Sequence, residues 1–142
     1  MSLYIDTSAL LKLFFVEPES ERAVLMIMAE SHVTVSSLAQ LEALVQVRRR
    51  LASGLIKAET ATRLELQVES RLRLAPFHMR KCSGELIEAA RKQAVSSSTY
   101  CSTLDRLHLA AMEVFGLRRL LTNDDAQAAA ARALGYEVLM PR

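Results

Sequence analysis

The chain has 142 residues, of which 51% are hydrophobic and only four are glycine, so we expect one compact domain over residues 1–142 rather than a disordered chain. The formal net charge of +2 is too small to indicate nucleic-acid binding by itself. No apolar run reaches the ~18 residues of a spanning helix, and the N-terminus lacks the pattern of a signal peptide. These features exclude a membrane-spanning helix and favour a cytoplasmic protein.

Short apolar segments alternate with long helical patterns along the whole chain. The segments predicted as strands are residues 3–5, 32–35, 76–79, 120–122 and 136–139. Helices are predicted from residue 7 or 8, and over residues 23–29, 37–52, 57–74, 83–95, 103–115 and 126–134. This alternation is typical of an α/β fold with a mainly parallel sheet.

Four acidic residues stand at positions that favour chemistry in such a fold. Asp6 and Asp124 follow the first and fourth predicted strands, Asp105 lies in the first turn of a helix, and Glu42 lies in mid-helix. Ligands of open α/β sheets bind beyond the carboxyl ends of the strands. Carboxylates gathered there repel one another unless a cation joins them, and hard divalent cations take oxygen ligands. The set predicts a metal-dependent enzyme, and most directly one that cuts a phosphodiester.

Each carboxylate also has an ordinary structural explanation. Asp6 is an N-cap candidate, although the two hydroxyl residues that follow it would cap equally well. Ser102 and Asp105 have the spacing of a capping box. Asp124, or Asp125 beside it, is a candidate cap for the last helix. The functional interpretation therefore depends on the set and not on any single member.

Glu42 is the one carboxylate that no cap explains. The apolar residues Leu38, Leu41 and Val45 predict a buried helix face with Glu42 at its edge. Arg49 is two turns further on and returns to nearly the same side of the helix. This arrangement suits a metal ligand followed by a phosphate contact, and it equally suits a glutamate whose head reaches water.

The assembled motifs resemble the PIN domain, in particular the VapC-type toxin ribonucleases of type II toxin–antitoxin systems. The resemblance covers essentially the whole chain in the right order. Its segments are Tyr4-Ile5-Asp6-Thr7-Ser8-Ala9-Leu10, Ser36-Ser37-Leu38 leading to Glu42, Leu104-Asp105-Arg106-Leu107-His108-Leu109-Ala110, Leu121-Thr122-Asn123-Asp124, and Ala133-Leu134-Gly135-Tyr136-Glu137-Val138.

The resemblance implies a three-layer sandwich in which helices flank a small, mainly parallel sheet of about five strands. It also implies a Mg²⁺- or Mn²⁺-dependent endoribonuclease with one or two ions. The family's catalytic and metal-ligating positions fall on Asp6, Glu42, Asp105 and Asp124, and its small polar positions at the metal site fall on Ser8 and Thr122. Asp125 departs from the pattern, since relatives often carry a basic or neutral residue there.

Substrate and partners follow from the same resemblance. The substrate is RNA, and Arg48, Arg49, Arg50 and Arg106 are candidates for contacts with its phosphates, although an arginine run is also an ordinary solvated face. His108 is predicted to be a packed core residue rather than a general base. VapC-type proteins form homodimers and bind a small antitoxin, so we expect both.

Two rival functions remain open. One is a catalytically silent PIN-like domain that binds RNA or a protein. The other is a haloacid-dehalogenase-like phosphatase, but that family has a second aspartate two residues after the first, where this chain has Ser8.

Overall fold

The structure is a computed structural model and describes residues 2–142. Its centre is a five-stranded sheet with the strand order β3-β2-β1-β4-β5, in which every neighbouring pair is parallel. The strands are β1 (Leu3–Ile5), β2 (Val33–Ser36), β3 (Phe77–Arg80), β4 (Arg119–Leu121) and β5 (Glu137–Leu139). The predicted α/β fold is confirmed.

Helices cover both faces of this sheet. Successive side chains of a strand point to opposite faces, so Leu3 and Ile5 pack on one side and Tyr4 on the other. The first side is covered by α1 (Thr7–Leu11), α2 (Ser20–Met28), α3 (Ser37–Ala52) and α4 (Ala58–Arg71). The second side is covered by α5 (Glu85–Ser96), α6 (Thr103–Phe115) and α7 (Asp125–Ala133). The predicted three-layer sandwich is therefore present.

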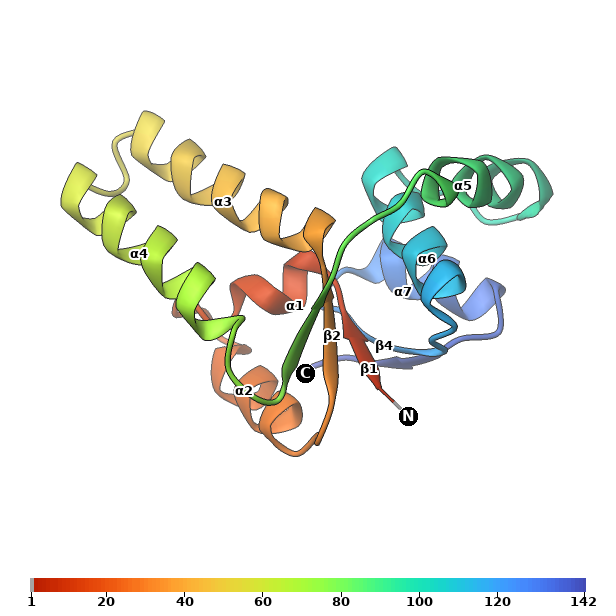
Figure 1. Cartoon of the computed structure of the whole chain (residues 1–142), viewed down its shortest axis with the longest axis horizontal. Helices are drawn as coiled ribbons and strands as arrows, with labels where there is room; N and C mark the ends of the chain where they lie inside the picture. Colours follow the sequence, from red (N-terminus) through yellow and green to blue (C-terminus); the bar gives the residue numbers. More distant parts are fainter. Residues whose placement is uncertain (1) are drawn as a thin grey trace.

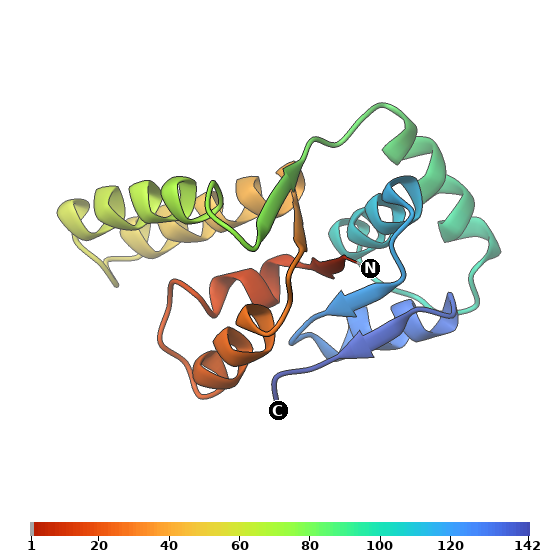
Figure 2. The ribbon, with the colours of Figure 1, turned by 60° about the horizontal axis from the view of Figure 1, so that its bottom comes forward.

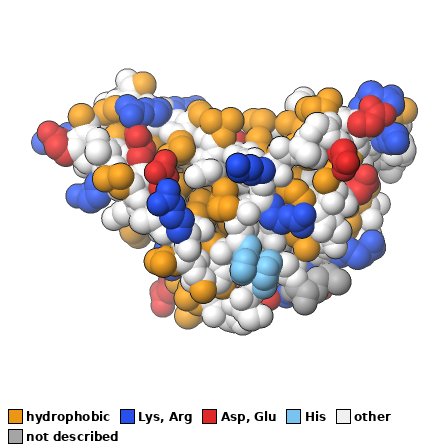
Figure 3. All heavy atoms as spheres, viewed as in Figure 1, with side chains coloured by type: hydrophobic (Ala, Val, Ile, Leu, Met, Phe, Trp, Pro, Cys, Tyr) orange, Lys and Arg blue, Asp and Glu red, His pale blue; other side chains and the backbone are white. Residues whose placement is uncertain are grey.

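Two pairs of helices stand as arms beyond the carboxyl ends of the strands. The α3–α4 pair lies on one side of the molecule and the α5–α6 pair on the other (Figure 1). The space-filling view is hollowed along its upper margin between these arms (Figure 3). In the view turned by 60°, β4 and then β5 follow β1 in the sheet, with α7 behind them (Figure 2). Because β1 and β4 are parallel, their carboxyl ends lie at the same edge of the sheet.

The apolar face predicted for α3 is wrong. Ala39, Ala43 and Val47 are the buried residues, whereas Leu41 and Val45 are 59% and 52% exposed. The alanines recur every four residues and allow the helix to approach the core closely, because their side chains end at Cβ. The larger side chains of Leu41 and Val45 lie on the outer face of α3.

α2 is half buried and half exposed. Ala23 and Ile27 face the core, while Leu25 and Met28 are 65% and 51% exposed. α2 is therefore not fully buried. None of the helices within residues 2–142 is long and apolar enough to cross a membrane.

Gln127 in α7 carries an unpartnered amide inside the core. Its side chain is fully buried, and neither its Oε1 nor its Nε2 has a hydrogen-bond partner in the part of the chain that the structure describes. Burying an unsatisfied amide costs about 1–3 kcal/mol. We expect Gln127→Met, which keeps the volume and removes the polar atoms, to stabilise the protein by about 1–2 kcal/mol in chemical denaturation.

Gln93 provides the matched control. It is also buried, but its Nε2 donates to the Glu113 carboxylate at 3.2 Å, and its Oε1 accepts from Arg106 at 3.4 Å. Gln93→Met should therefore destabilise the protein. Equal losses of stability in both variants would show that the amide of Gln127 is satisfied.

Candidate active site

Asp6 is placed by the turn from β1 into α1. It is the N-cap of α1, because its Oδ1 accepts from the backbone N–H of Ala9 at 3.0 Å. Oδ1 also accepts from Ser8 Oγ at 2.7 Å, and Oδ2 accepts from Thr122 Oγ1 at 2.5 Å. The sequence left capping open to the hydroxyl residues that follow, but Asp6 itself performs it.

The hydroxyl groups around Asp6 join the ends of β1 and β4. Ser8 Oγ accepts from the backbone N–H of Asn123 at 2.9 Å, and Thr122 Oγ1 accepts from that of Asp124 at 3.0 Å. The Asp6 side chain is almost fully buried, and this burial raises the pKa of Asp6, while the charge of His108 and the hydrogen bonds oppose the rise. The network therefore fixes a carboxylate whose ionised form is costly without a cation.

Glu42 projects from the second turn of α3 into a second polar network. Its Oε1 accepts from Thr7 Oγ1 at 2.7 Å and lies 2.7 Å from His108 Nε2. The other ring nitrogen of His108 lies 2.7 Å from the hydroxyl of Tyr4, which donates to Ser36 Oγ. Burial raises the pKa of Glu42, but the contacts from His108 and Thr7 outweigh it and hold this pKa below its ordinary value.

The predicted core position of His108 is confirmed, since only 2% of the residue is exposed. Its contacts, however, connect the core to the acidic site. His108 lies one turn after Asp105 on α6, and its ring reaches Glu42 on α3. We interpret it as a positioning residue that holds Glu42 in place.

Asp105 and Asp124 occupy helix N-termini on either side of the Asp6 network. Ser102 caps α6 by accepting from the backbone N–H of Asp105 at 3.2 Å, as the capping-box spacing predicted. Asp124 caps α7 by accepting from the backbone N–H of Gln127 at 3.0 Å. Burial raises the pKa of Asp105, and the charges of Asp124 and Asp6 raise it further. These three carboxylates therefore interact electrostatically.

Asp125 contacts Arg142 at the protein surface. Its carboxylate forms a 2.7 Å ion pair with Arg142, and its side chain is 79% exposed. Arg142 also donates to the carbonyl oxygen of Asn123 at 2.9 Å. The extra negative charge is thus paired with the C-terminal arginine.

The four arginines differ in how they are engaged. Arg48 forms a 2.8 Å ion pair with Glu65. The guanidinium carbon of Arg50 lies 3.7 Å from the ring centre of Phe15. The exposed Arg49 side chain makes no hydrogen bond, ion pair or ring contact within the described residues.

Arg106, the fourth of these arginines, is 6% exposed and lies under the loop between α5 and α6. Arg49 is therefore the arginine of the group that is freest to meet a phosphate at the surface.

Carboxylate and hydroxyl oxygens, which make up the Asp6 network, are the type of ligand that hard divalent cations take. Among residues 2–142, no three Asp, Glu, His or Cys side chains stand close enough together to hold a metal ion. Within the same described residues, Asp6 Oδ2 accepts one hydrogen bond, from Thr122 Oγ1. Burial raises the pKa values of both Asp6 and Asp105, and the charges of Asp124 and Asp6 raise that of Asp105 further. A bound cation would oppose these shifts, because it favours the ionised carboxylates.

Comparisons with known proteins agree with this geometry. A family model for the PIN domain matches residues 3–133. The chain belongs to the PIN domain family. A comparison with curated protein sequences gave no significant match.

Among solved structures, Mycobacterium tuberculosis VapC20, described as a sarcin-ricin loop cleaving toxin, has a TM-score of 0.72 at 18% identity, over 90% of this chain and 94% of that one. FitAcB of Neisseria gonorrhoeae has a TM-score of 0.74 at 19% identity, over 98% and 97%. DNA-bound VapBC of Salmonella typhimurium has a TM-score of 0.73 at 14% identity, over 100% and 99%. These similarities show the fold.

Thr7 and Tyr4 were not predicted from the sequence as parts of the site. Thr7 donates to Glu42, and Tyr4 contacts His108 from the middle of β1. A signal was available for both, because a histidine within an apolar helix stripe needs hydrogen-bond partners when it is buried. Which segment of the chain supplies those partners depends on the tertiary fold, so the sequence alone does not identify them.

Proposed function

We propose that this chain is a divalent-metal-dependent endoribonuclease and the toxin of a toxin–antitoxin pair. The observation that carries the proposal is the set of four carboxylates around the carboxyl ends of β1 and β4 in a PIN domain. The structurally similar proteins include a toxin described as cleaving the sarcin-ricin loop and several toxin–antitoxin complexes. Their fold, and the order of acidic residues by which this chain resembles VapC-type toxins, support the same activity here.

Asp6, Glu42 and Asp105 would hold the first Mg²⁺ or Mn²⁺ ion directly or through water molecules, because Mg²⁺ tends to retain several waters. Asp124 would complete the site for one ion or two. A bound divalent cation activates a water molecule and neutralises the charge that develops on the phosphate. Ser8 and Thr122 hold Asp6 in position through hydrogen bonds to its carboxylate.

The remaining residues of the chain orient these groups and the substrate. Thr7 and His108 hold Glu42 from two different elements, which fixes its rotamer. Arg49 is on the same helix as Glu42 and is exposed, so it would bind a phosphate of the RNA strand. We place this activity in the cytoplasm, where RNA is available.

The test is digestion of total RNA by the purified protein. We expect cleavage at a small number of positions in the presence of Mg²⁺ or Mn²⁺ and none in excess EDTA. Mapping the 5′ ends of the fragments would identify the RNA that is cut. Intact RNA under all metal conditions would contradict the proposal.

A catalytically silent domain is the second candidate. It is favoured by the hydrogen bonds that already satisfy much of Asp6 and Glu42 without a metal. It predicts Mg²⁺ or Mn²⁺ binding, or binding of RNA, without any cleavage. The digestion experiment separates the two when it is combined with a binding measurement.

We also propose a homodimer and a small antitoxin as partners. The exposed apolar residues of α2 and α3, which include Leu25, Met28, Leu41 and Val45, supply surface for such contacts. A monomer by light scattering at micromolar concentration would count against the dimer. An adjacent small reading frame whose product binds this chain would support the antitoxin.

A further inference from the structure

A cavity of about 530 Å³ lies between α5, α6 and the loop that joins them. Its volume falls within the range of small-ligand pockets, about 300–1,000 Å³. The walls include the apolar side chains of Ile87, Ala94 and Leu107, and the polar lining includes Tyr100 and Arg106. The cavity is therefore largely apolar, and the positively charged residue Arg106 is part of its wall.

Arg106 is a buried cation without an anionic partner. It donates to the carbonyl oxygen of Thr99 at 2.9 Å and to Gln93 Oε1 at 3.4 Å, and both acceptors are uncharged. No carboxylate forms an ion pair with Arg106 in the portion of the chain that is described. A guanidinium has five N–H donors, and a buried charge that lacks a counter-charge is costly. An anion in the cavity would supply that counter-charge.

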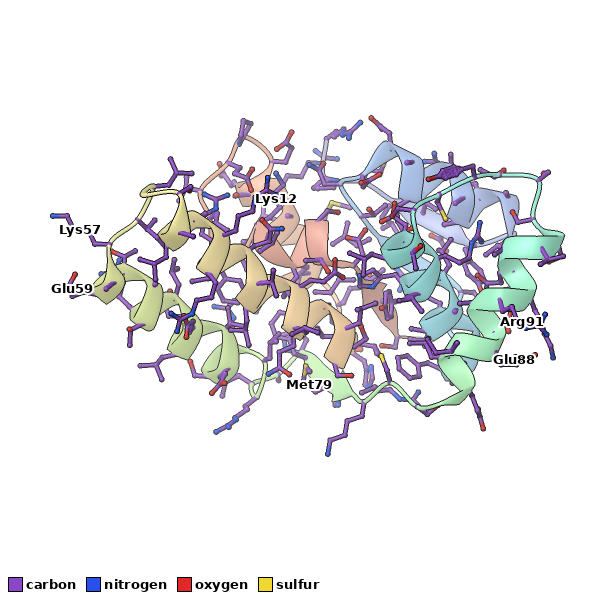
Figure 4. The ribbon with its side chains drawn as sticks, turned by 90° about the horizontal axis from the view of Figure 1, so that it is seen from above. Lys12, Lys57, Glu59, Met79, Glu88 and Arg91 are labelled. Carbon is purple, nitrogen blue, oxygen red and sulfur yellow. The ribbon has the colours of Figure 1, made fainter. Side chains whose placement is uncertain are left out.

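Arg91, the second arginine in the cavity wall, has an anionic partner. Arg91 forms a 2.6 Å ion pair with Glu88, and Figure 4 shows both side chains projecting from the outer side of α5. Its charge is already matched. The unmatched positive charge of the cavity is therefore that of Arg106.

Tyr100 provides an aromatic surface at the same cavity. It lines the cavity and is 80% exposed. An exposed aromatic ring next to a cation is the combination by which proteins bind single-stranded nucleic acid, with a base stacked on the ring and a phosphate at the cation.

The cavity is also next to the acidic site. Arg106 follows Asp105 directly on α6, and Cys101 in the cavity wall is close enough to feel the charges of Asp105 and Asp124, which contribute to raising its pKa after the larger effect of burial. The cavity therefore adjoins the start of α6, where Asp105 lies.

We propose that the α5–α6 cavity is a nucleotide subsite, which takes one nucleotide of the RNA beside the cleaved bond, with its phosphate at Arg106 and its base on Tyr100. This inference depends on the proposed ribonuclease function. The chemistry that it requires is an anion joined to an aromatic base. A protein partner at the cavity is the competing outcome.

The test measures the affinity for a fluorescein-labelled single-stranded RNA of about ten nucleotides, in EDTA, by fluorescence anisotropy. We expect Tyr100→Ala to weaken binding about tenfold and Tyr100→Phe to retain it, because the ring is what stacks. Val95→Ala is the matched control, since Val95 is on α5, is also 80% exposed and does not line the cavity. We expect it to bind as the unmodified chain does.

Arg106→Gln adds a second readout. Losing one phosphate contact should reduce the slope of log affinity against log salt by about 0.7. If circular dichroism shows that Arg106→Gln is unfolded, the variants of the exposed Tyr100 still test the nucleotide subsite. A change in the position or base preference of cleavage in Tyr100→Ala would further support the subsite.

The outcomes separate the subsite from the parent function. If the unmodified chain binds and cleaves RNA but Tyr100→Ala and Val95→Ala are indistinguishable, the subsite is wrong and the ribonuclease stands. If Tyr100→Ala changes the mass in solution and leaves RNA affinity unchanged, the cavity is a protein interface and the subsite is overturned. If the unmodified chain neither binds nor cleaves RNA, both proposals fail.

Discussion

Asp105→Asn is expected to reduce metal-dependent RNA cleavage by on the order of 10²–10³-fold, because metal activation contributes several kcal/mol and each ~1.4 kcal/mol is a factor of ten. Asp105 is half-buried at the start of α6, and its pKa is raised by burial and then by Asp124 and Asp6. Replacing it with a neutral isostere removes a negative charge where a cation has to bind. The measurement is the initial rate of cleavage of a mapped RNA site with saturating Mg²⁺.

Asp125→Asn is the control for this experiment. The same substitution at Asp125 removes a charge that is exposed and paired with Arg142, so we expect cleavage to stay within about twofold. Circular dichroism and a melting curve verify that both variants are folded. Equal activity of Asp105→Asn and the unmodified chain would remove Asp105 from the site.

Divalent cations are expected to stabilise the folded protein strongly above the pKa values of Asp6 and Asp105. In the folded state both pKa values are raised, mainly by burial, so the folded chain binds more protons than the unfolded chain. Stability without metal therefore falls as the pH rises from the ordinary pKa of an aspartate through these raised values. Glu42 has the opposite sign, because its pKa is lowered.

A bound cation removes the cost that ionised Asp6 and Asp105 carry. At a cation concentration of about 100 times the dissociation constant, the stabilisation is about 2.7 kcal/mol. For a chain of this size that raises Tm by roughly 5–10 °C. We expect this shift at pH 7.5 with Mn²⁺, and a smaller one as the pH falls toward the raised pKa values.

The Asp105→Asn variant controls for general ionic effects. Its melting temperature without metal should be equal to or higher than that of the unmodified chain, since a repelling charge is gone. The shift on adding Mn²⁺ should be much smaller. An unchanged shift in this variant, or no shift in the unmodified chain at pH 7.5, would contradict a site that includes Asp105.

The strands could be predicted from the sequence because each is a short apolar segment between helical patterns. All five were placed with boundaries that differ by at most one residue from those in the structure. The face of α3 could not be predicted in this way. Leu41 and Val45 are more hydrophobic than Ala39 and Ala43, but the small residues pack against the core. Close approach of two elements is a tertiary requirement that hydrophobicity does not encode.

The members of the candidate site stay a prediction from the sequence, and the contacts that connect them could not be predicted from it. The sequence treated capping and function as alternatives for Asp6, whereas one oxygen of its carboxylate caps α1 and the other faces Thr122. His108 was assigned to the core without its contact to Glu42, which joins α6 to α3. Such contacts link residues far apart along the chain, and a single sequence has no local signal for them.

The central claim is that the carboxylates around β1 and β4 form one divalent-cation site that performs RNA cleavage. Calorimetric titration of Mn²⁺ into the unmodified chain, Asp6→Asn, Asp105→Asn and Asp125→Asn tests it most directly, with cleavage measured on the same samples. We predict one or two ions per chain for the unmodified protein and Asp125→Asn, and loss of both binding and cleavage in Asp6→Asn and Asp105→Asn. Cleavage that persists in both of these variants, or that needs no divalent cation, would contradict the claim.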